Sequence, residues 1–195
     1  MTTSDPVITV VSGLPRSGTS MMMNMLVAGG LEPVQDGIRT ADEDNPKGYY
    51  EFERVKKIKQ DKGWLPDARG KVVKMIAQLL LDLPTSGYHY KVIFMRRSID
   101  EILASQRQMM VRRGTLKEDG PSDAEMGDML LKHLDHVMKW ADKQDCMDCL
   151  AVDYNEMLKN VAPSIARLNE FLDGKLDIAK MSAVVDKNLY RQRKD

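Results

Sequence analysis

Short apolar runs alternate along the chain with longer stretches in which apolar residues recur every three or four positions. The runs predict buried strands at 7–11, 71–76, 90–95 and 150–152. The longer stretches predict amphipathic helices that start near positions 20, 99, 122 and 163. Strands that alternate with helices predict an α/β protein with three layers, in which a central parallel sheet carries helices on both faces and binds ligands at the carboxyl ends of its strands.

Polar segments separate these elements. Residues 32–47 predict an exposed loop, which ends in the turn residues of DNPKGYYE at 44–51, where Glu51 is expected to open a helix. The charged, glycine-containing stretch 114–121 is typical of a surface loop or a lid over a site. Ser122 and Glu125 have the spacing of a capping box, which marks the start of the next helix.

The segment SGLPRSGTS, residues 12–20, joins the first predicted strand to the first helix. Such a turn presents backbone N–H groups and the positive end of a helix to an anion, which favours phosphate binding. Gly13 and Gly18 have the spacing of a Walker A loop, but Thr19 occupies the lysine position. Since Arg16 supplies the positive charge instead, we expect an anion other than a magnesium-bound triphosphate. The alternative is a turn whose glycines serve only the backbone geometry.

Composition narrows the choice of partners. The 195 residues predict a single domain, 1–195, and contain 29 basic and 29 acidic residues, so no overall positive field favours nucleic acid. No stretch has the length and hydropathy of a membrane span or a signal segment, and a cytoplasmic protein is therefore expected. Cys146 and Cys149 form one isolated CxxC, which is too little for a zinc site.

The loop PRSGTS at 15–20 resembles the 5′-phosphosulfate loop of the sulfotransferase family, a branch of the P-loop fold. The resemblance implies 3′-phosphoadenosine 5′-phosphosulfate (PAPS) as the sulfonate donor and 3′-phosphoadenosine 5′-phosphate (PAP) as its product. It also implies that the 5′-phosphate is held by the residues Pro15, Arg16, Ser17, Gly18, Thr19 and Ser20.

A second resemblance follows the strand at 90–95. RRSIDEILAS, residues 96–105, is similar to the 3′-phosphate motif of the same family, which carries over to Arg97 at the strand end and Ser105 in the next helix. The planar fork of an arginine suits a terminal phosphate, and a hydroxyl adds a donor. Taken alone, the same residues are also consistent with a solvated arginine and a serine on a helix surface.

The catalytic residues are also inferred from the family. Lys74 interrupts an apolar strand, as does a lysine that contacts the sulfonate in cytosolic sulfotransferases, but Ile76 stands where those proteins have a histidine base. We therefore expect a carboxylate base, with Glu51 as first choice, and Arg16 and Lys74 as stabilisers of developing charge. The family's C-terminal phosphate-binding loop has no counterpart, and among the basic residues that could replace it is Arg191.

The resemblance thus implies transfer of a sulfonate from PAPS, without a metal, to a hydroxyl or amine of a small acceptor. One alternative is an atypical P-loop kinase or NTPase in which Asp153 binds magnesium. Another is a non-catalytic nucleotide-binding protein of the same fold. Neither the acceptor nor the oligomeric state has a signature in the sequence.

Overall fold

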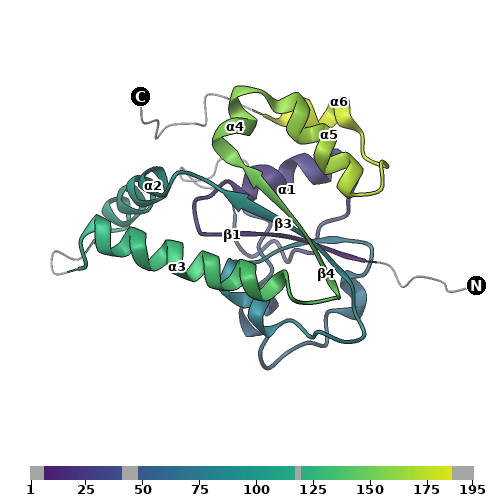
Figure 1. Ribbon diagram of the computed structural model, residues 1–195, viewed down its shortest axis with the longest axis horizontal. Helices are drawn as coiled ribbons and strands as arrows, with labels where there is room; N and C mark the ends of the chain where they lie inside the picture. Colours follow the sequence, from purple (N-terminus) through teal and green to yellow (C-terminus); the bar gives the residue numbers. More distant parts are fainter. Residues whose placement is uncertain (1–6, 41–47, 117–119, 186–195) are drawn as a thin grey trace, which may run out of the picture.

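The computed structural model describes residues 7–40, 48–116 and 120–185 (Figure 1). Within these residues, four parallel strands form one sheet in the order β2-β1-β3-β4. The strands are β1 (Ile8–Gly13), β2 (Val72–Lys74), β3 (Tyr90–Arg96) and β4 (Met147–Asp153). The predicted central parallel sheet is thus confirmed.

The central position of β1 explains its sequence. All six of its residues are buried because neighbouring strands flank it on both sides and helices cover both faces, so it reads as a continuous apolar run. At the edge of the sheet, β4 starts three residues before the run at 150–152. Asp148 and Cys149 are exposed in this edge strand, and their exposure hid its start from the apolar pattern.

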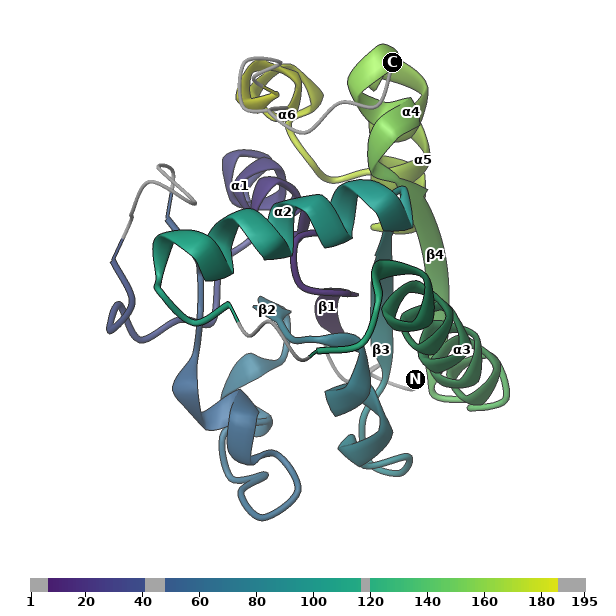
Figure 2. The same ribbon diagram turned by 90° about the vertical axis from the view of Figure 1, so that its left-hand side faces the viewer.

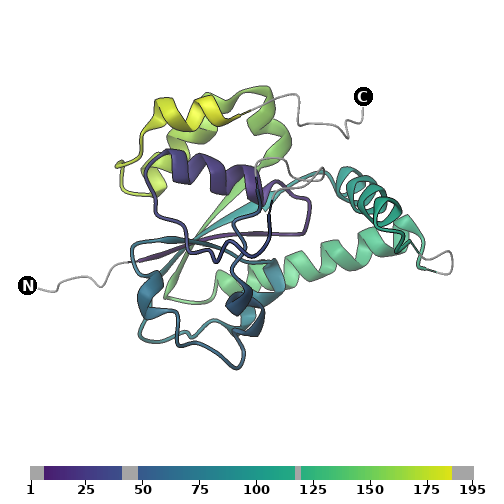
Figure 3. The ribbon, with the colours of Figure 1, turned by 180° about the vertical axis from the view of Figure 1, so that it is seen from behind.

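Helices cover both faces of the sheet, which confirms the three-layer arrangement (Figures 1 and 3). One face carries α1 (Thr19–Ala28), α4 (Tyr154–Lys159), α5 (Val161–Phe171) and α6 (Ile178–Val184). The other face carries α3 (Asp123–Ala141) and three 3₁₀ helices, η1 (Glu53–Lys57), η2 (Pro66–Ala68) and η3 (Ala77–Asp82). The remaining helix, α2 (Ile99–Arg112), packs against α3.

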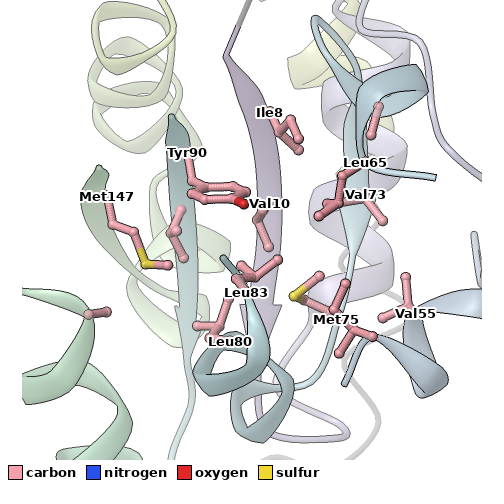
Figure 4. Close-up of a cluster of buried hydrophobic side chains, with 14 of the residues drawn as sticks. Ile8, Val10, Val55, Leu65, Val73, Met75, Leu80, Leu83, Tyr90 and Met147 are labelled. Atoms are coloured by element: carbon pink, nitrogen blue, oxygen red, sulfur yellow. The ribbon is translucent and has the colours of Figure 1, made fainter. Parts of the chain in front are cut away.

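Two apolar clusters hold the layers together. The cluster in Figure 4 packs β1, β2 and β3 against η3 and α3. It includes Tyr90, whose hydroxyl donates to the carbonyl of Pro84 at 3.1 Å. The second cluster lies under α1, where Met22, Met23 and Met25 are fully buried. Adaptable methionine side chains therefore fill the core between α1 and the sheet.

Local signals correctly placed most helix starts. Ser122 and Glu125 form the expected capping box at the start of α3. The helix expected to open at Glu51 is wrong, because only a single 3₁₀ segment, η1, forms there and it starts at Glu53. Val55 and Ile58 are buried three positions apart, a spacing that one 3₁₀ turn satisfies as well as an α-helix does.

The sheet order defines where ligands are expected. The chain leaves β1 towards α1 on one face and leaves β3 towards α2, and these two strands are neighbours. Figure 2 looks at the side of the molecule on which α2 crosses in front of the strands. In open α/β sheets, such a point beyond the carboxyl ends of adjacent strands is the usual binding position. None of the described helices is both long and apolar enough to span a membrane.

Candidate active site

The loop between β1 and α1 adopts a backbone that requires glycine at position 18. Gly18 has φ +98°, and a Cβ there would lie 2.3 Å from the ring of Tyr154. Arg16 also has a positive φ, 75°, so its side chain leaves the loop in a direction that an ordinary turn does not give. The glycine of the predicted phosphate loop thus serves a close packing contact as well as a turn.

Polar groups in this loop are suited to an anion. Gly18 provides no side-chain cap for α1, and the first turn of α1 contains no acidic residue. The N–H groups of the first turn of α1, which begins with Thr19 and Ser20, are therefore available to a ligand at the positive end of the helix. The hydroxyls of Ser12 and Ser17 are buried and have no hydrogen-bond partner within the described residues.

Arg97 follows β3 and turns back towards this loop. Its Nη1 donates to the carbonyl oxygen of Arg16 at 3.0 Å, and its Nε donates to a carboxylate oxygen of Glu101 at 2.8 Å. Its guanidinium carbon lies 4.8 Å from the centre of the Tyr154 ring. Only 9% of the Arg97 side chain and 4% of the Glu101 side chain are exposed, so the pair is shielded from water.

Ser105 belongs to the same group. The Nε of Arg16 donates to its hydroxyl oxygen at 2.9 Å across 89 residues of sequence, and Ser105 is buried in α2. The structure therefore brings Arg16, Arg97 and Ser105 together beyond the carboxyl ends of β1 and β3. Pro15 lies exposed at the loop tip, where its carbonyl accepts from Gln106 of α2 at 3.4 Å.

Lys74 and Glu51 form a second group at the carboxyl end of β2. The Nζ of Lys74 lies 3.9 Å from Oε1 of Glu51 and donates to the backbone carbonyl of Tyr49. Arg39 donates to Glu51 at 2.6 Å and stacks on the ring of Tyr49, with its guanidinium carbon 3.4 Å from the ring centre. Lys74 and Glu51 are largely buried, at 13% and 19% exposure of their side chains.

A short chain of hydrogen bonds ties this second group to the start of α1. The hydroxyl of Tyr50 donates to Oδ1 of Asn24 at 3.0 Å, and the Asn24 amide donates to the carbonyl of Ser20 at 3.0 Å. Tyr50 has φ +49°, an uncommon conformation for a residue of this size. Arg39 and Asn24 were missed by sequence reasoning because neither lies in a motif.

Burial lowers the pKa of Lys74 to about 8 from its usual value near 10.5, while the nearby carboxylate of Glu51 opposes that shift. At pH 7 the amine is still mostly protonated, so its charge is available to an anion at the cost of desolvation. Above pH 8 the folded protein loses this proton, whereas the unfolded chain keeps it up to about pH 10.5.

We expect Lys74→Met to change stability in a pH-dependent way. Between pH 8 and 10.5 the unfolded wild-type chain binds more protons at this position than the folded one, so Lys74 makes the free energy of unfolding rise with pH. The stability of the variant relative to wild type should therefore be most favourable at pH 7 and decrease by roughly 2 kcal/mol towards pH 10. Urea unfolding at several pH values measures this difference, and a constant difference would contradict the assignment.

The remaining candidates lie away from these groups or outside the described residues. Asp153 accepts from the backbone N–H of Glu156 at 3.0 Å and caps α4, the role of an N-cap residue. Ile76 is 46% exposed just after β2. Arg191 lies outside the described residues. Among the residues that are described, no three of His, Cys, Asp or Glu cluster in a way that could hold a metal ion.

The fold and the site define a class of protein. A glycine-bearing loop joins a central parallel strand to a helix, and two arginines and a serine meet beside it, which is the geometry of a P-loop protein for a phosphorylated ligand. The family model of the sulfotransferase domain matches residues 6–195. The chain therefore belongs to the sulfotransferase domain family.

Solved structures share this fold. The sulfotransferase domain from the curacin biosynthetic pathway has a TM-score of 0.55 and 14% sequence identity, over 93% of this chain and 78% of that one. A mouse sulfotransferase, SULT7A1, complexed with PAP has a TM-score of 0.51 and 14% identity, over 92% of this chain and 62% of its own. No curated protein matches the sequence.

Proposed function

We propose that the protein transfers a sulfonate group from PAPS to a hydroxyl or amine of a small acceptor. Membership of the sulfotransferase domain family supports the reaction class. The observation that carries the proposal is the meeting of Arg97 and Ser105 with Arg16 of the loop. The loop and the two residues beyond it suit a nucleotide that carries phosphate groups at both the 5′ and the 3′ positions.

The residues present fit such a donor. The unpaired hydroxyl of Ser17 and the uncapped first turn of α1 offer donors to the 5′-phosphate side, and Arg97 with Ser105 brings a positive charge and a hydroxyl to the 3′-phosphate side. When bound, PAPS supplies the sulfonate. Arg16 and Lys74 would neutralise charge that develops as the bond between sulfur and the bridging oxygen breaks.

The acceptor side would be formed by Glu51 and Lys74. Glu51 would accept the proton of the acceptor hydroxyl or amine as its oxygen or nitrogen bonds to sulfur, a role that contributes about 10²- to 10⁴-fold to a rate. In the structure Glu51 faces the cationic side chains of Arg39, at 2.6 Å, and Lys74, at 3.9 Å. The guanidinium of Arg39 contacts Oε1 of Glu51, which is the same oxygen that Lys74 approaches.

No observation favours the kinase or NTPase alternative. That function would need Asp153 to bind magnesium, but this carboxylate is exposed and caps α4. A non-catalytic member of the family would still bind the nucleotide. Such a protein would have the same donor site as the enzyme but would not turn over PAPS.

Thermal unfolding with nucleotides tests the proposal. A ligand that binds only the folded protein raises its apparent stability, and at ~100 times its Kd the rise in melting temperature is roughly 5 to 10 °C for a chain of this size. We expect this rise with PAP, unchanged by magnesium, and little or no rise with ADP or ATP.

Three other outcomes would each count against a part of the proposal. A rise only with ATP and magnesium would favour the kinase alternative and overturn ours. No response to any nucleotide would indicate that the donor site is degenerate. Binding of PAP without release of PAP from PAPS, in a screen of small alcohols, phenols and amines, would favour a non-catalytic protein.

A further inference from the structure

A polar network, buried at Glu101 and half-buried at Asn155, contacts Arg97 at its Nε. Glu101 lies one helical turn after Arg97, in α2, and accepts from its Nε at 2.8 Å. The other carboxylate oxygen of Glu101 accepts from the side-chain amide of Asn155 at 2.9 Å. Asn155 is the second residue of α4, so the network joins two helices that lie more than fifty residues apart in sequence.

Asn155 also holds the backbone beside Arg97. Its Oδ1 accepts from the N–H of Ser98 at 3.1 Å, while its amide nitrogen donates to Glu101. This pair of contacts fixes which end of the amide is which, because a flipped amide would place oxygen against oxygen at Glu101 and N–H against N–H at Ser98. One side chain therefore constrains both the backbone that carries Arg97 and the carboxylate that orients its guanidinium.

The chemistry at position 101 requires a carboxylate. Arg97 and Asn155 both present N–H donors to Glu101, one to each oxygen. A glutamine would offer one acceptor and one donor, so it would satisfy one partner and oppose the other. An ionised carboxylate accepts at both ends, and its burial makes both hydrogen bonds sensitive to substitution.

We propose that Glu101 and Asn155 are positioning residues that hold the Arg97 guanidinium for the 3′-phosphate of the donor nucleotide. This inference rests on the proposed function, because it requires a nucleotide with a 3′-phosphate. It assigns no contact with the ligand to either residue. Their effect passes through Arg97, so they should control the preference for 3′-phosphorylated nucleotides while leaving the 5′-phosphate loop intact.

The test compares PAP with 5′-AMP, which lacks only the 3′-phosphate. Calorimetry on the full chain gives the Kd of each nucleotide. The Kd for 5′-AMP divided by the Kd for PAP reports the contribution of the 3′-phosphate. We expect Asn155→Ala and Glu101→Gln each to reduce this ratio by about ten-fold, the factor for one charge-assisted hydrogen bond. The affinity for 5′-AMP should stay within about two-fold of wild type, which shows that the variants are folded.

Glu156→Gln is the matched control, since Glu156 neighbours Asn155 on α4 but is exposed and pairs with Lys159. It should leave the ratio unchanged. Equal losses for PAP and 5′-AMP in Asn155→Ala would mean a purely structural role and overturn the proposal. A higher ratio in Glu101→Gln would mean that Glu101 only repels the phosphate, which also overturns it. A wild-type protein with no preference for PAP would instead disprove the donor site itself.

Discussion

Gly18→Ala is expected to destabilise the fold and to abolish nucleotide binding. Alanine at φ +98° is strained, and its Cβ would lie 2.3 Å from the Tyr154 ring, which is itself packed beneath the loop. Strain and overpacking each cost about 1 to 3 kcal/mol, so the free energy of unfolding should fall by about 2 to 6 kcal/mol. Urea unfolding measures this loss, and thermal unfolding with PAP measures the loss of binding.

Gly30→Ala separates the two causes. Gly30 has a similar φ of +112°, but a Cβ there would meet no atom within 4 Å, so this variant carries only the conformational cost of about 1 to 3 kcal/mol. In a Tyr154→Ala background the steric part should disappear, and Gly18→Ala should cost less than it does in wild type. If Gly18→Ala proved no more costly than Gly30→Ala, Tyr154 would not constrain the loop.

The contact between Gly18 and Tyr154 illustrates what the sequence could and could not predict. Gly13 and Gly18 between an apolar run and a helical stripe were enough to predict the loop, because strand, turn and helix are local features. That Tyr154 packs against this loop depends on β4 lying beside β3 and on α4 starting at that edge. Contacts of this kind form only when the sheet is assembled.

The same distinction applies to the two charged groups. The sequence could place Arg97 and Ser105 at the same crevice, because a residue at a strand end and a residue two turns along the next helix can face the same ligand. Arg16 reaches Ser105 through a positive φ that no pattern indicates. Glu101 had the i, i+4 spacing from Arg97 of a helix ion pair, but glutamate is seldom buried, so its burial could not be read from the sequence.

Errors in element boundaries have equally local causes. Ile178–Val184, which is α6, follows Gly174 closely and contains no long apolar stripe, so the sequence predicted no helix there. The one signal available was the N-cap residue Asp177, whose carboxylate accepts from the backbone N–H of Lys180. α5 starts at Val161, two residues before Pro163. The helix tolerates Pro163 in its first turn, because the N–H groups there have no partner within the helix and a proline loses no hydrogen bond.

Arg97→Ala is expected to reduce stability and nucleotide preference together. The substitution removes the positive charge that faces Glu101, whose side chain is only 4% exposed. Breaking a buried ion pair by removing one partner costs about 3 to 5 kcal/mol, since the remaining charge is desolvated without compensation. The free energy of unfolding should fall by that amount in urea titrations at pH 7, and the preference for PAP over 5′-AMP should vanish.

Arg96→Ala is the matched control, because Arg96 is the preceding residue and is exposed. Its cost should stay within about 0.5 kcal/mol, as for surface substitutions in general. The double variant Arg97→Ala/Glu101→Gln should recover part of the lost stability, since it also removes the buried negative charge, yet it should not recover the preference for PAP. Stability and specificity would then separate at this pair: charge balance sets the first, and the guanidinium itself sets the second. Recovery of both by the double variant would refute a direct role of Arg97 at the 3′-phosphate.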